Sequence, residues 1–371
     1  MRGSSDGDGP GTTLAELAAE GVSSWWQGIH RSALDSGWFT ATAGTAGLRG
    51  ATTDLAVLLA ELRSDGAVAY DRQVSALAAV GTESATAAGA LLRADAQSAC
   101  DVLLPVFQDT EGHDGWVSVD LPPDIAHDRR ATVSAAKAVT AGLDRPNALV
   151  KIPATVAGVA AVRECLALGI GVHVAEVFSP TRYGQVVDAC LDGLEQARTA
   201  GVRLDALAAV VALPVGPLSA AVADQVDETG RIPAGLAVAR LLFHDREQRL
   251  GTTRWRALRT AGARQHRLLW TDLGDRAADL DRLVGWGSVV ALGSRALEAL
   301  ASGPRLHGDT LLGAHDAARA ALDGLAGLGV DFAAVERRLE HDRAHRQVRL
   351  WTELCEAVGT RLSELKGSPI S

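Results

Sequence analysis

The sequence predicts an α/β protein of the (β/α)8 TIM-barrel class with additional C-terminal helices. Eight short apolar segments, several of them rich in β-branched residues, are spread along the chain, and each is followed by a helical pattern. Parallel strands with helical crossovers in this number favour a closed barrel over an open doubly wound sheet. An open sheet, the structural alternative, usually carries a glycine-rich phosphate turn after its first strand. The segment W-W-Q-G-I-H from Trp25 has no such turn.

The elements follow one another in a regular order. We expect strands at Gly21–Trp26, Gly47–Thr53, Gly115–Leu121, Ala148–Ile152, Ile170–Phe178, Leu207–Leu213, Leu268–Thr271 and Gly287–Leu292. We expect helices at Leu14–Glu20, Ser32–Phe39, within Asp54–Ala99, at His127–Leu143, Val156–Leu168 and Pro180–Ala200, and further on to about Gly262. Residues 1–13 are rich in Gly, Ser and Asp and are expected to form a disordered tail. Residues 14–371 then form one domain, in which three helical segments in about 294–366 wrap the barrel or lie across its mouth.

Composition excludes several classes of protein. A chain of 371 residues with 47% hydrophobic content can bury a large core, and its formal charge of -9 with scattered arginines argues against nucleic-acid binding. No apolar run reaches the length of a membrane span, and the N-terminus lacks the pattern of an export signal. The cysteines are isolated and fit reduced thiols: Cys100, Cys165, Cys190 and Cys355. We therefore expect a soluble, cytoplasmic protein without membrane or nucleic-acid partners.

Lys151 lies in the middle of the apolar segment Ala148–Ile152. Because burying an ammonium is unfavourable, a lysine there either pairs with a carboxylate or becomes a neutral, nucleophilic amine. The chain has three lysines, Lys137, Lys151 and Lys366, among 36 basic residues. Since arginine serves elsewhere, a lysine in this strand suggests work that arginine cannot do, such as forming a Schiff base with a carbonyl compound. The alternative is a strand-end lysine whose amine reaches water.

Catalytic residues of such barrels lie at the carboxyl ends of the strands. These positions hold Gln27 with Gly28, Asp54, Asp120, Lys151, His173 with Glu176 and Ser179, Pro214 with Gly216, and Asp272 with Arg276. They contain no metal-ligand pair and no nucleophilic serine elbow, and we expect no metal and no cofactor. What remains is carbonyl chemistry by an amine, with Asp120 or another carboxylate carrying protons.

Several of these residues also have structural interpretations. His173 could be a packed, hydrogen-bonded histidine, Asp54 could cap the helix after it, and Asp272 could pair with Arg276. Strand alternation places Glu176 on the face towards the helices. Two tryptophans, Trp25 and Trp26, either line an apolar pocket at the mouth or belong to the core.

Longer motifs resemble one family. N-A-L-V-K-I-P-A-T-x-x-G covers residues 147–158, and G-I-x-V-x-V-x-x-x-F-S-x-x-R-Y-x-x-V-x-x-A-x-x-x-G-L-E-x-A covers residues 169–197. A-C-D-V-L-L-P-V from Ala99, D-R-P-N before the lysine strand, R-W-R-A-L-R-T-A-G-A-R around Trp255 and G-D-T from Gly308 extend the likeness over nearly the whole chain. The sequence resembles the transaldolases, in particular their long actinobacterial form. The resemblance implies a barrel in which Lys151 forms a Schiff base with a ketose phosphate, and the enamine left after carbon–carbon cleavage is added to an aldose phosphate.

The chain departs from this family at acid and base positions. Trp26–Gly28 replaces a segment with an aspartate, so the base implied for deprotonating the substrate hydroxyl is absent. The family's asparagine after strand two is Asp54 here, and its strand-three glutamate is Asp120. In strand five His173–Ala175 replaces N-V-T and removes a hydroxyl that holds the catalytic water. Glu176, where the family is apolar, is a candidate replacement acid or base.

The implied phosphate site departs as well. Val211–Gly216 lacks the serine and the arginine that the family carries after strand six. Asp272 stands where a phosphate oxygen would lie, which leaves only Arg276 nearby. A phosphate needs fixed cations and hydrogen-bond donors, and a carboxylate there repels it.

Three functional hypotheses follow. The first is a Schiff-base enzyme of specialised metabolism that makes or breaks a carbon–carbon bond of a carbonyl compound other than the usual sugar phosphate. The second is an inactive relative with a binding or structural role, and the third is an ordinary transaldolase. For the active enzyme we expect Lys151, Asp120, His173 and Glu176 to carry the chemistry, and Trp26, Gln27, Asp54, Ser179, Asp272 and Arg276 to contact a small carbonyl substrate. The protein would act as a monomer or a homodimer.

Overall fold

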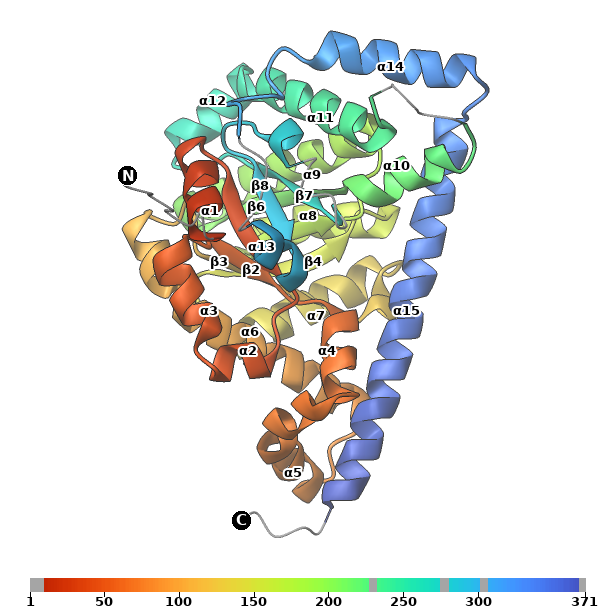
Figure 1. Cartoon of the computed structure of the whole chain (residues 1–371). Helices are drawn as coiled ribbons and strands as arrows, with labels where there is room; N and C mark the ends of the chain where they lie inside the picture. The colour runs from red at the N-terminus through yellow and green to blue at the C-terminus, as the bar shows by residue number, and fades with distance from the viewer. Residues whose placement is uncertain (1–9, 227–231, 274–279, 301–305, 367–371) are drawn as a thin grey trace, which may run out of the picture.

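The protein is a closed barrel of eight parallel strands in chain order (Figure 1). The computed structural model describes residues 10–226, 232–273, 280–300 and 306–366. The strands are β1 (Ser23–Gln27), β2 (Gly50–Thr52), β3 (Trp116–Asp120), β4 (Ala148–Pro153), β5 (Val172–Ala175), β6 (Ala209–Pro214), β7 (Arg267–Thr271) and β8 (Val289–Leu292). The barrel closes where β8 pairs with β1, with Ser23 opposite Val289. The predicted (β/α)8 class and all eight expected strands are therefore confirmed, and the open sheet is excluded.

Helices surround the barrel and connect its strands. The first half contains α1 (Pro10–Ala19), α2 (Arg31–Asp35), α3 (Trp38–Ala41), α4 (Leu55–Leu62), α5 (Asp71–Ala79), α6 (Ser84–Asp109) and α7 (Arg129–Leu143). The second half contains α8 (Val156–Ala167), α9 (Pro180–Thr199), α10 (Val215–Ala223), α11 (Ala234–Leu250) and α12 (Thr253–Thr260). Helix α1 begins inside the segment 1–13 that was expected to be a tail, and residues 1–9 lie outside the described part of the chain. No helix in the described ranges combines the length and the apolar character needed to span a bilayer.

Strand alternation divides the core into two layers. Side chains that point into the barrel form one cluster, made of Trp25, Trp116, Leu149, Ala208, Val210, Ala212, Leu269, Val289 and Ala291. Their neighbours along the strands, such as Trp26 and Val150, point outwards into the larger cluster beneath the helices. The barrel interior is therefore packed, and polar side chains gather at the carboxyl ends of the strands.

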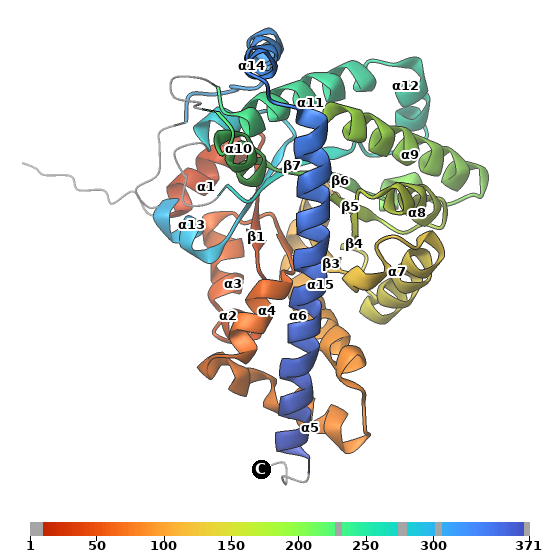
Figure 2. The same ribbon diagram turned by 90° about the vertical axis from the view of Figure 1, so that its right-hand side faces the viewer.

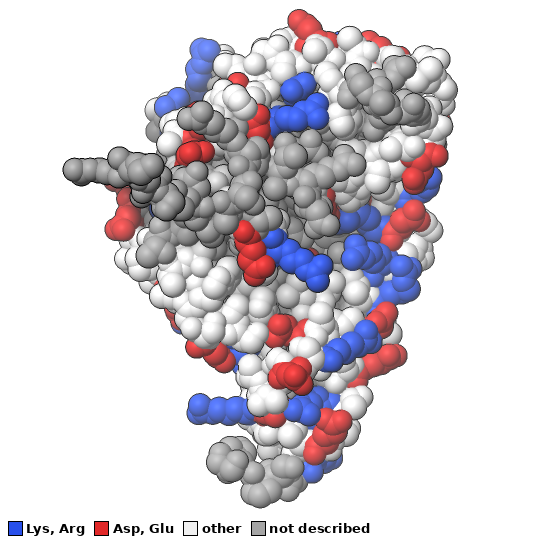
Figure 3. All heavy atoms as spheres, in the orientation of Figure 1, with Lys and Arg blue, Asp and Glu red and all other residues white. Residues whose placement is uncertain are grey.

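Three helices follow β8, as predicted: α13 (Ser294–Ala299), α14 (His315–Gly327) and α15 (Phe332–Leu365). Figure 2 shows α15 crossing in front of the barrel. Polar contacts tie it to the body of the protein at both ends: Ser179 to Glu336 (2.7 Å), Arg182 to Glu340 (3.2 Å), Arg63 to Glu353 (2.9 Å) and Asp71 to Arg361 (2.7 Å). Basic and acidic side chains alternate along the edge of the molecule where α15 lies (Figure 3). Helix α15 is therefore held against the body of the protein by contacts near both of its ends.

The turn from β4 into α8 is built around a tightly packed glycine. The Thr155 side chain accepts a hydrogen bond from the backbone N–H of Gly158 at 2.9 Å, which caps α8, and its hydroxyl donates to the Ala126 carbonyl at 2.6 Å. A Cβ atom on Gly158 would lie 2.0 Å from the carbonyl oxygen of Pro153. The P-A-T-x-x-G part of the motif therefore fixes how the strand that carries Lys151 ends.

We predict that Gly158→Ala lowers the free energy of unfolding by about 1–3 kcal/mol, because the backbone oxygen in its way cannot move aside as a flexible side chain could. The control is Gly89→Ala in α6, where no atom lies within 4 Å of the added Cβ. That substitution should leave stability unchanged or raise it by up to about 1 kcal/mol. Thermal unfolding followed by circular dichroism compares the two, and equal losses would contradict the packing argument.

Candidate active site

The amine of Lys151 is held between β2 and β3. Its Nζ donates a hydrogen bond to the Thr53 carbonyl at 2.7 Å and lies 3.1 Å from Oδ2 of Asp120. The parallel register places Asp120 directly opposite Lys151, so the pairing follows from the sheet. Of the two alternatives for a lysine in this strand, the structure shows the carboxylate partner. The Lys151 side chain is nevertheless 16% exposed, so the amine is not closed off.

Asp120 is fixed on its other side by Thr53. The Thr53 hydroxyl donates to Oδ2 at 2.7 Å, and the Asp120 backbone N–H donates to that hydroxyl at 2.9 Å. Burial raises the pKa of Asp120 above its ordinary value, although the Lys151 charge and the Thr53 hydrogen bond oppose the shift. A carboxylate with raised proton affinity beside an amine is suited to exchanging a proton with it.

His173 lies beside Lys151 on the neighbouring strand. Its Nδ1 is 2.8 Å from the Ser118 hydroxyl, which donates to Thr52 Oγ1 at 2.7 Å, and Thr52 donates to the Thr53 carbonyl at 3.3 Å. Because each hydroxyl has one proton to give, this chain requires Nδ1 to be the donor and leaves a lone pair on Nε2. Burial, with a smaller contribution from Lys151, holds the pKa of His173 well below its ordinary value. The imidazole is therefore neutral near pH 7, and its Nε2 is a buried acceptor without a partner among the described residues.

Two small cavities meet at this amine. One, of about 120 Å³, extends over the ends of β1, β2 and β7, and the other, of about 90 Å³, extends between β3, β4 and α15. Both are lined by Asp120, Lys151, Glu176, Arg343 and Gln347, the last two from α15. The C-terminal helix therefore forms a wall of the site as well as part of the fold.

Three of the predicted substrate contacts lie together in the first cavity. Gln27 Nε2 donates to Asp54 Oδ2 at 3.2 Å and to Asp272 Oδ1 at 3.3 Å. Asp54 also caps α4 by accepting the backbone N–H of Ala56 at 2.9 Å, which is the structural interpretation considered above. All three predicted residues line the cavity, where the two carboxylates share the amide of Gln27.

Arg343 of α15 joins the carboxylates that follow β5 and β7. Its Nε lies 2.6 Å from Glu176 Oε2, and its Nη2 donates to Asp272 Oδ2 at 2.7 Å. The alternation argument that placed Glu176 towards the helices was wrong. The strand ends at Ala175, and Glu176 has a left-handed backbone (φ +63°), which turns its side chain into the mouth. Burial raises the pKa of Glu176, and the Arg343 charge opposes that shift.

Three other predicted residues are not placed in the mouth. Trp26 points outwards and packs on Phe39, with Nε1 donating to Ser294 Oγ at 3.2 Å, because strand alternation turns it away from the barrel interior. Ser179 caps α9 and donates to Glu336 at 2.7 Å, and it lines neither cavity. Arg276 lies outside the described residues, so the predicted pairing with Asp272 remains a prediction, while Asp272 is held by Arg343.

Sequence reasoning missed two residues of the site. Thr53 was expected only as the last residue of the second strand, although its position beside Asp54 at a strand end was a usable signal. Arg343 gave no signal, because it is one of several arginines on a polar helix and only the packing of α15 brings it to the mouth.

A larger hollow, of about 1320 Å³, lies at the opposite end of the barrel. Two of its arginines hold that end together: Arg267 is 2.7 Å from Asp114, and Arg264 donates to the carbonyls of Asp205 and Glu111. None of the predicted site residues lines it. Within the described ranges, no group of three or more His, Cys, Asp or Glu is arranged to hold a metal ion.

Comparison with known proteins gives full-length similarity to one family. The family profile described as transaldolase/fructose-6-phosphate aldolase matches residues 28–358. A transaldolase of Acidothermus cellulolyticus is 37% identical over 365 residues, which cover 95% of this chain and 98% of that protein. Transaldolases of Thermobifida fusca and Mycobacterium tuberculosis are 35% and 34% identical, covering 95% and 94% of this chain and 99% and 97% of their own lengths.

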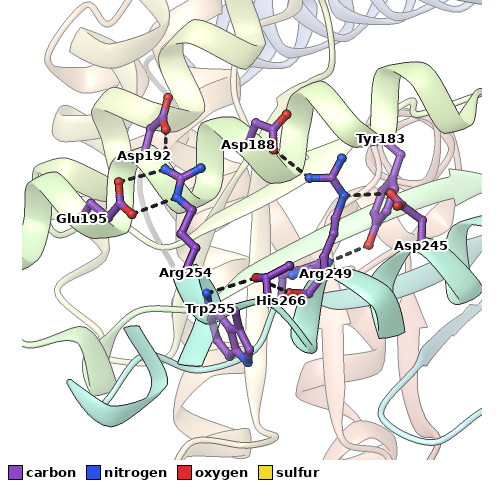
Figure 4. A network of polar contacts seen from close by, with 10 residues as sticks. Tyr183, Asp188, Asp192, Glu195, Asp245, Arg249, Arg254, Trp255 and His266 are labelled. Carbon is purple, nitrogen blue, oxygen red and sulfur yellow. Dashed lines mark hydrogen bonds and ion pairs between the residues drawn. The ribbon is translucent and has the colours of Figure 1, made fainter. Parts of the chain in front are cut away.

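Several motif residues lie far from Lys151 in a polar network between α9 and the α11–α12 region (Figure 4). Arg254 bonds Asp192 (2.5 Å) and Glu195 (2.8 Å). Tyr183 and Nε2 of His266 are 2.6 Å apart, and both side chains are buried. These residues hold the helical layer against the barrel. The motifs therefore combine one candidate catalytic residue with many structural ones.

The buried His266 predicts a pH dependence of stability. Burial, assisted by the Arg246 and Arg249 charges, lowers the pKa of His266 to about 3. The unfolded chain binds this proton near its ordinary pKa of about 6.5, so between these values the unfolded state holds more protons and stability falls as the pH falls. The loss should grow by about 1.4 kcal/mol per pH unit across this window.

The measurement is the unfolding midpoint between about pH 4 and pH 6.5, within the window just defined. His266→Gln removes the titration but keeps an acceptor for Tyr183, so its profile should be shallower than that of the unmodified protein. His341→Gln, on the exposed face of α15, is the control and should leave the slope unchanged. Parallel profiles for His266→Gln and the unmodified protein would contradict the assignment.

Proposed function

The chain belongs to the transaldolase/fructose-6-phosphate aldolase family, and from that premise we propose that Lys151 forms a Schiff base with a small carbonyl compound. The protein is thus an aldolase or transferase in which this bond precedes the making or breaking of a carbon–carbon bond. The observation that carries the proposal is the Lys151 amine, 3.1 Å from a proton-accepting carboxylate and open to two cavities. We propose further that the substrate is a carbonyl compound other than the usual sugar phosphate.

The proposed first step moves one proton and makes one bond. The Lys151 ammonium gives a proton to Asp120, and the freed nitrogen lone pair attacks the carbonyl carbon. A proton then passes from the nitrogen to the former carbonyl oxygen, and the Asp120 proton follows, so that this oxygen leaves as water. A protonated imine remains, with Asp120 again ionised. The hydrogen bond to the Thr53 carbonyl orients the amine throughout.

His173 and Glu176 take different parts in this proposal. The free Nε2 of His173 accepts a hydrogen bond from a substrate hydroxyl and orients it, since the aspartate that the family carries on strand one is Gln27 here. Because His173 is a weak base, it positions the hydroxyl but does not take its proton at neutral pH. Glu176 is engaged by Arg343, so we assign it to the wall of the site instead of proton transfer.

The ordinary transaldolase reaction is the second candidate. It is favoured by the full-length similarity to proteins named transaldolase. Against it stand Asp272 and the Val211–Gly216 segment, where the phosphate-binding groups implied by the family are replaced. Assaying transfer from fructose 6-phosphate to an aldose phosphate separates the two candidates, because an active transaldolase turns over this pair and the proposed enzyme does not.

We predict that reduction with cyanoborohydride in the presence of dihydroxyacetone links one molecule covalently to Lys151. The mass should rise by that of the carbonyl compound less one oxygen atom, and peptide mapping should place it on Lys151. The other lysines, Lys137 and Lys366, are exposed and serve as internal controls. Lys151→Arg should remove the adduct. No adduct with any small ketone or aldehyde, or labelling confined to the exposed lysines, would favour the inactive relative.

Asp120→Asn should slow formation of the adduct by about 10²–10⁴-fold, because an amide can neither take the amine proton nor return it to the leaving water. Asp120→Glu restores the carboxylate that the family carries at this position and should recover most of the rate. The rates are followed by intact mass against time at saturating dihydroxyacetone. An unchanged rate in Asp120→Asn would remove Asp120 from the proposed step.

A further inference from the structure

The two mouth carboxylates that depart from the family pattern form one cluster with Arg343. Glu176 replaces an apolar residue and Asp272 replaces a phosphate-side residue, and each forms an ion pair with the same guanidinium, at 2.6 and 2.7 Å. The three side chains are 16–24% exposed. Two departures that looked unrelated in the sequence therefore meet at one cation supplied by α15.

The backbone at both carboxylates is unusual. Among the described residues, four that are not glycine have a positive φ, and Glu176 (+63°) and Asp272 (+54°) are two of them. This conformation is costly for residues with a side chain and persists where the surroundings require it. Here it turns each carboxylate inwards from the end of its strand towards Arg343.

Among the described residues, the cluster leaves the mouth without an unpaired, buried cation for an anionic substrate. The charged groups that line the two-cavity mouth in the described ranges are Lys151, Arg343 and Arg346 against Asp54, Asp120, Glu176, Asp272 and Glu340. Lys151 is paired with Asp120, Arg343 with two carboxylates, and Glu340 with Arg182. Arg346 has no bonded partner in the described part of the chain, but it is exposed, where solvent screens its charge.

We infer that the cluster of Glu176, Arg343 and Asp272 determines the substrate class, and that this class is short carbonyl compounds without a phosphate group. The inference rests on the proposed function of Lys151. The two carboxylates hold the donors of Arg343 away from a substrate, and Asp272 places a negative charge where the family binds phosphate. The cavities of about 120 and 90 Å³ are small for a sugar phosphate and suit a compound of a few carbon atoms. Arg343 is thus a specificity-determining residue.

The test compares dihydroxyacetone with dihydroxyacetone phosphate in cyanoborohydride trapping at Lys151. The measured quantity is the second-order trapping rate constant for dihydroxyacetone phosphate divided by that for dihydroxyacetone. In the unmodified protein this ratio should be below one. In the double variant Glu176→Gln, Asp272→Asn the ratio should rise about tenfold or more, because Arg343 loses both carboxylates and becomes available to phosphate. Asparagine tolerates the left-handed backbone at position 272.

Three further variants identify the cause. Adding Arg343→Gln to the double variant should return the ratio to that of the unmodified protein. This result would show that the freed guanidinium binds the phosphate. Glu336→Gln breaks another carboxylate contact of α15, outside both cavities, and should leave the ratio unchanged. Arg346→Gln tests the exposed arginine, and loss of phosphate trapping in this variant alone would overturn the role of the cluster.

The outcomes separate this inference from the proposed function. Absence of any adduct at Lys151 with either compound defeats the proposed function, and the inference with it. Trapping of both compounds with a ratio of one or above in the unmodified protein, or an unchanged ratio in the double variant, overturns the inference while Lys151 keeps its role. Melting temperatures and the rate with neutral dihydroxyacetone show whether each variant is folded.

Discussion

The charge of Lys151 is the constraint on which the mouth of this barrel depends. An ammonium largely removed from water needs a partner, and removing one member of such a pair typically costs about 3–5 kcal/mol. Both partners come from neighbouring strands: the Thr53 carbonyl follows β2, and Asp120 ends β3 opposite the lysine. The site therefore exists only when three strands are in register. The same contacts that stabilise the amine also place a proton acceptor beside it. The residues needed for stability are therefore the residues needed for the proposed chemistry.

A second electrostatic requirement links the mouth of the barrel to the helices that follow the eighth strand. Glu176 and Asp272 bring two carboxylates towards the same space, and like charges this close are unfavourable without a cation between them. Arg343 is that cation, and it comes from the last helix of the chain. Helix α15 is therefore required by the electrostatics of the mouth as well as by its apolar contacts. The C-terminal extension therefore completes the mouth of the barrel, because without Arg343 the carboxylates of Glu176 and Asp272 would lack this cation.

The fold and part of the site could be predicted from the sequence because they depend on local patterns. Strand length and alternation placed seven of the eight strand ends to within one residue, while β5 ends at Ala175, three residues before the expected Phe178. The predicted strand ends supplied Gln27, Asp54, Asp120, Lys151, His173 and Asp272, which all line the mouth. The failures have physical causes that a single sequence does not show. Glu176 has a left-handed backbone, which glutamate rarely adopts, and this points its side chain into the mouth. Trp26 could occupy either face of its strand, because a tryptophan suits both. Arg343 depends on tertiary packing alone, which no periodicity reveals.

The motifs that carry the family likeness do two kinds of work. Asn147 bonds the carbonyls of Cys100 and Gly115, Thr155 caps α8, and Glu195 bonds Arg254, all of them contacts that hold helices and strands together. Lys151 is the motif residue that faces the cavity as a reactive group. Identity of 34–37% over nearly the whole length shows that the chain belongs to the family, and it carries little information about the substrate. The departures from the family lie among the few side chains around the amine, where Glu176 and Asp272 each pair with Arg343 from the C-terminal helix.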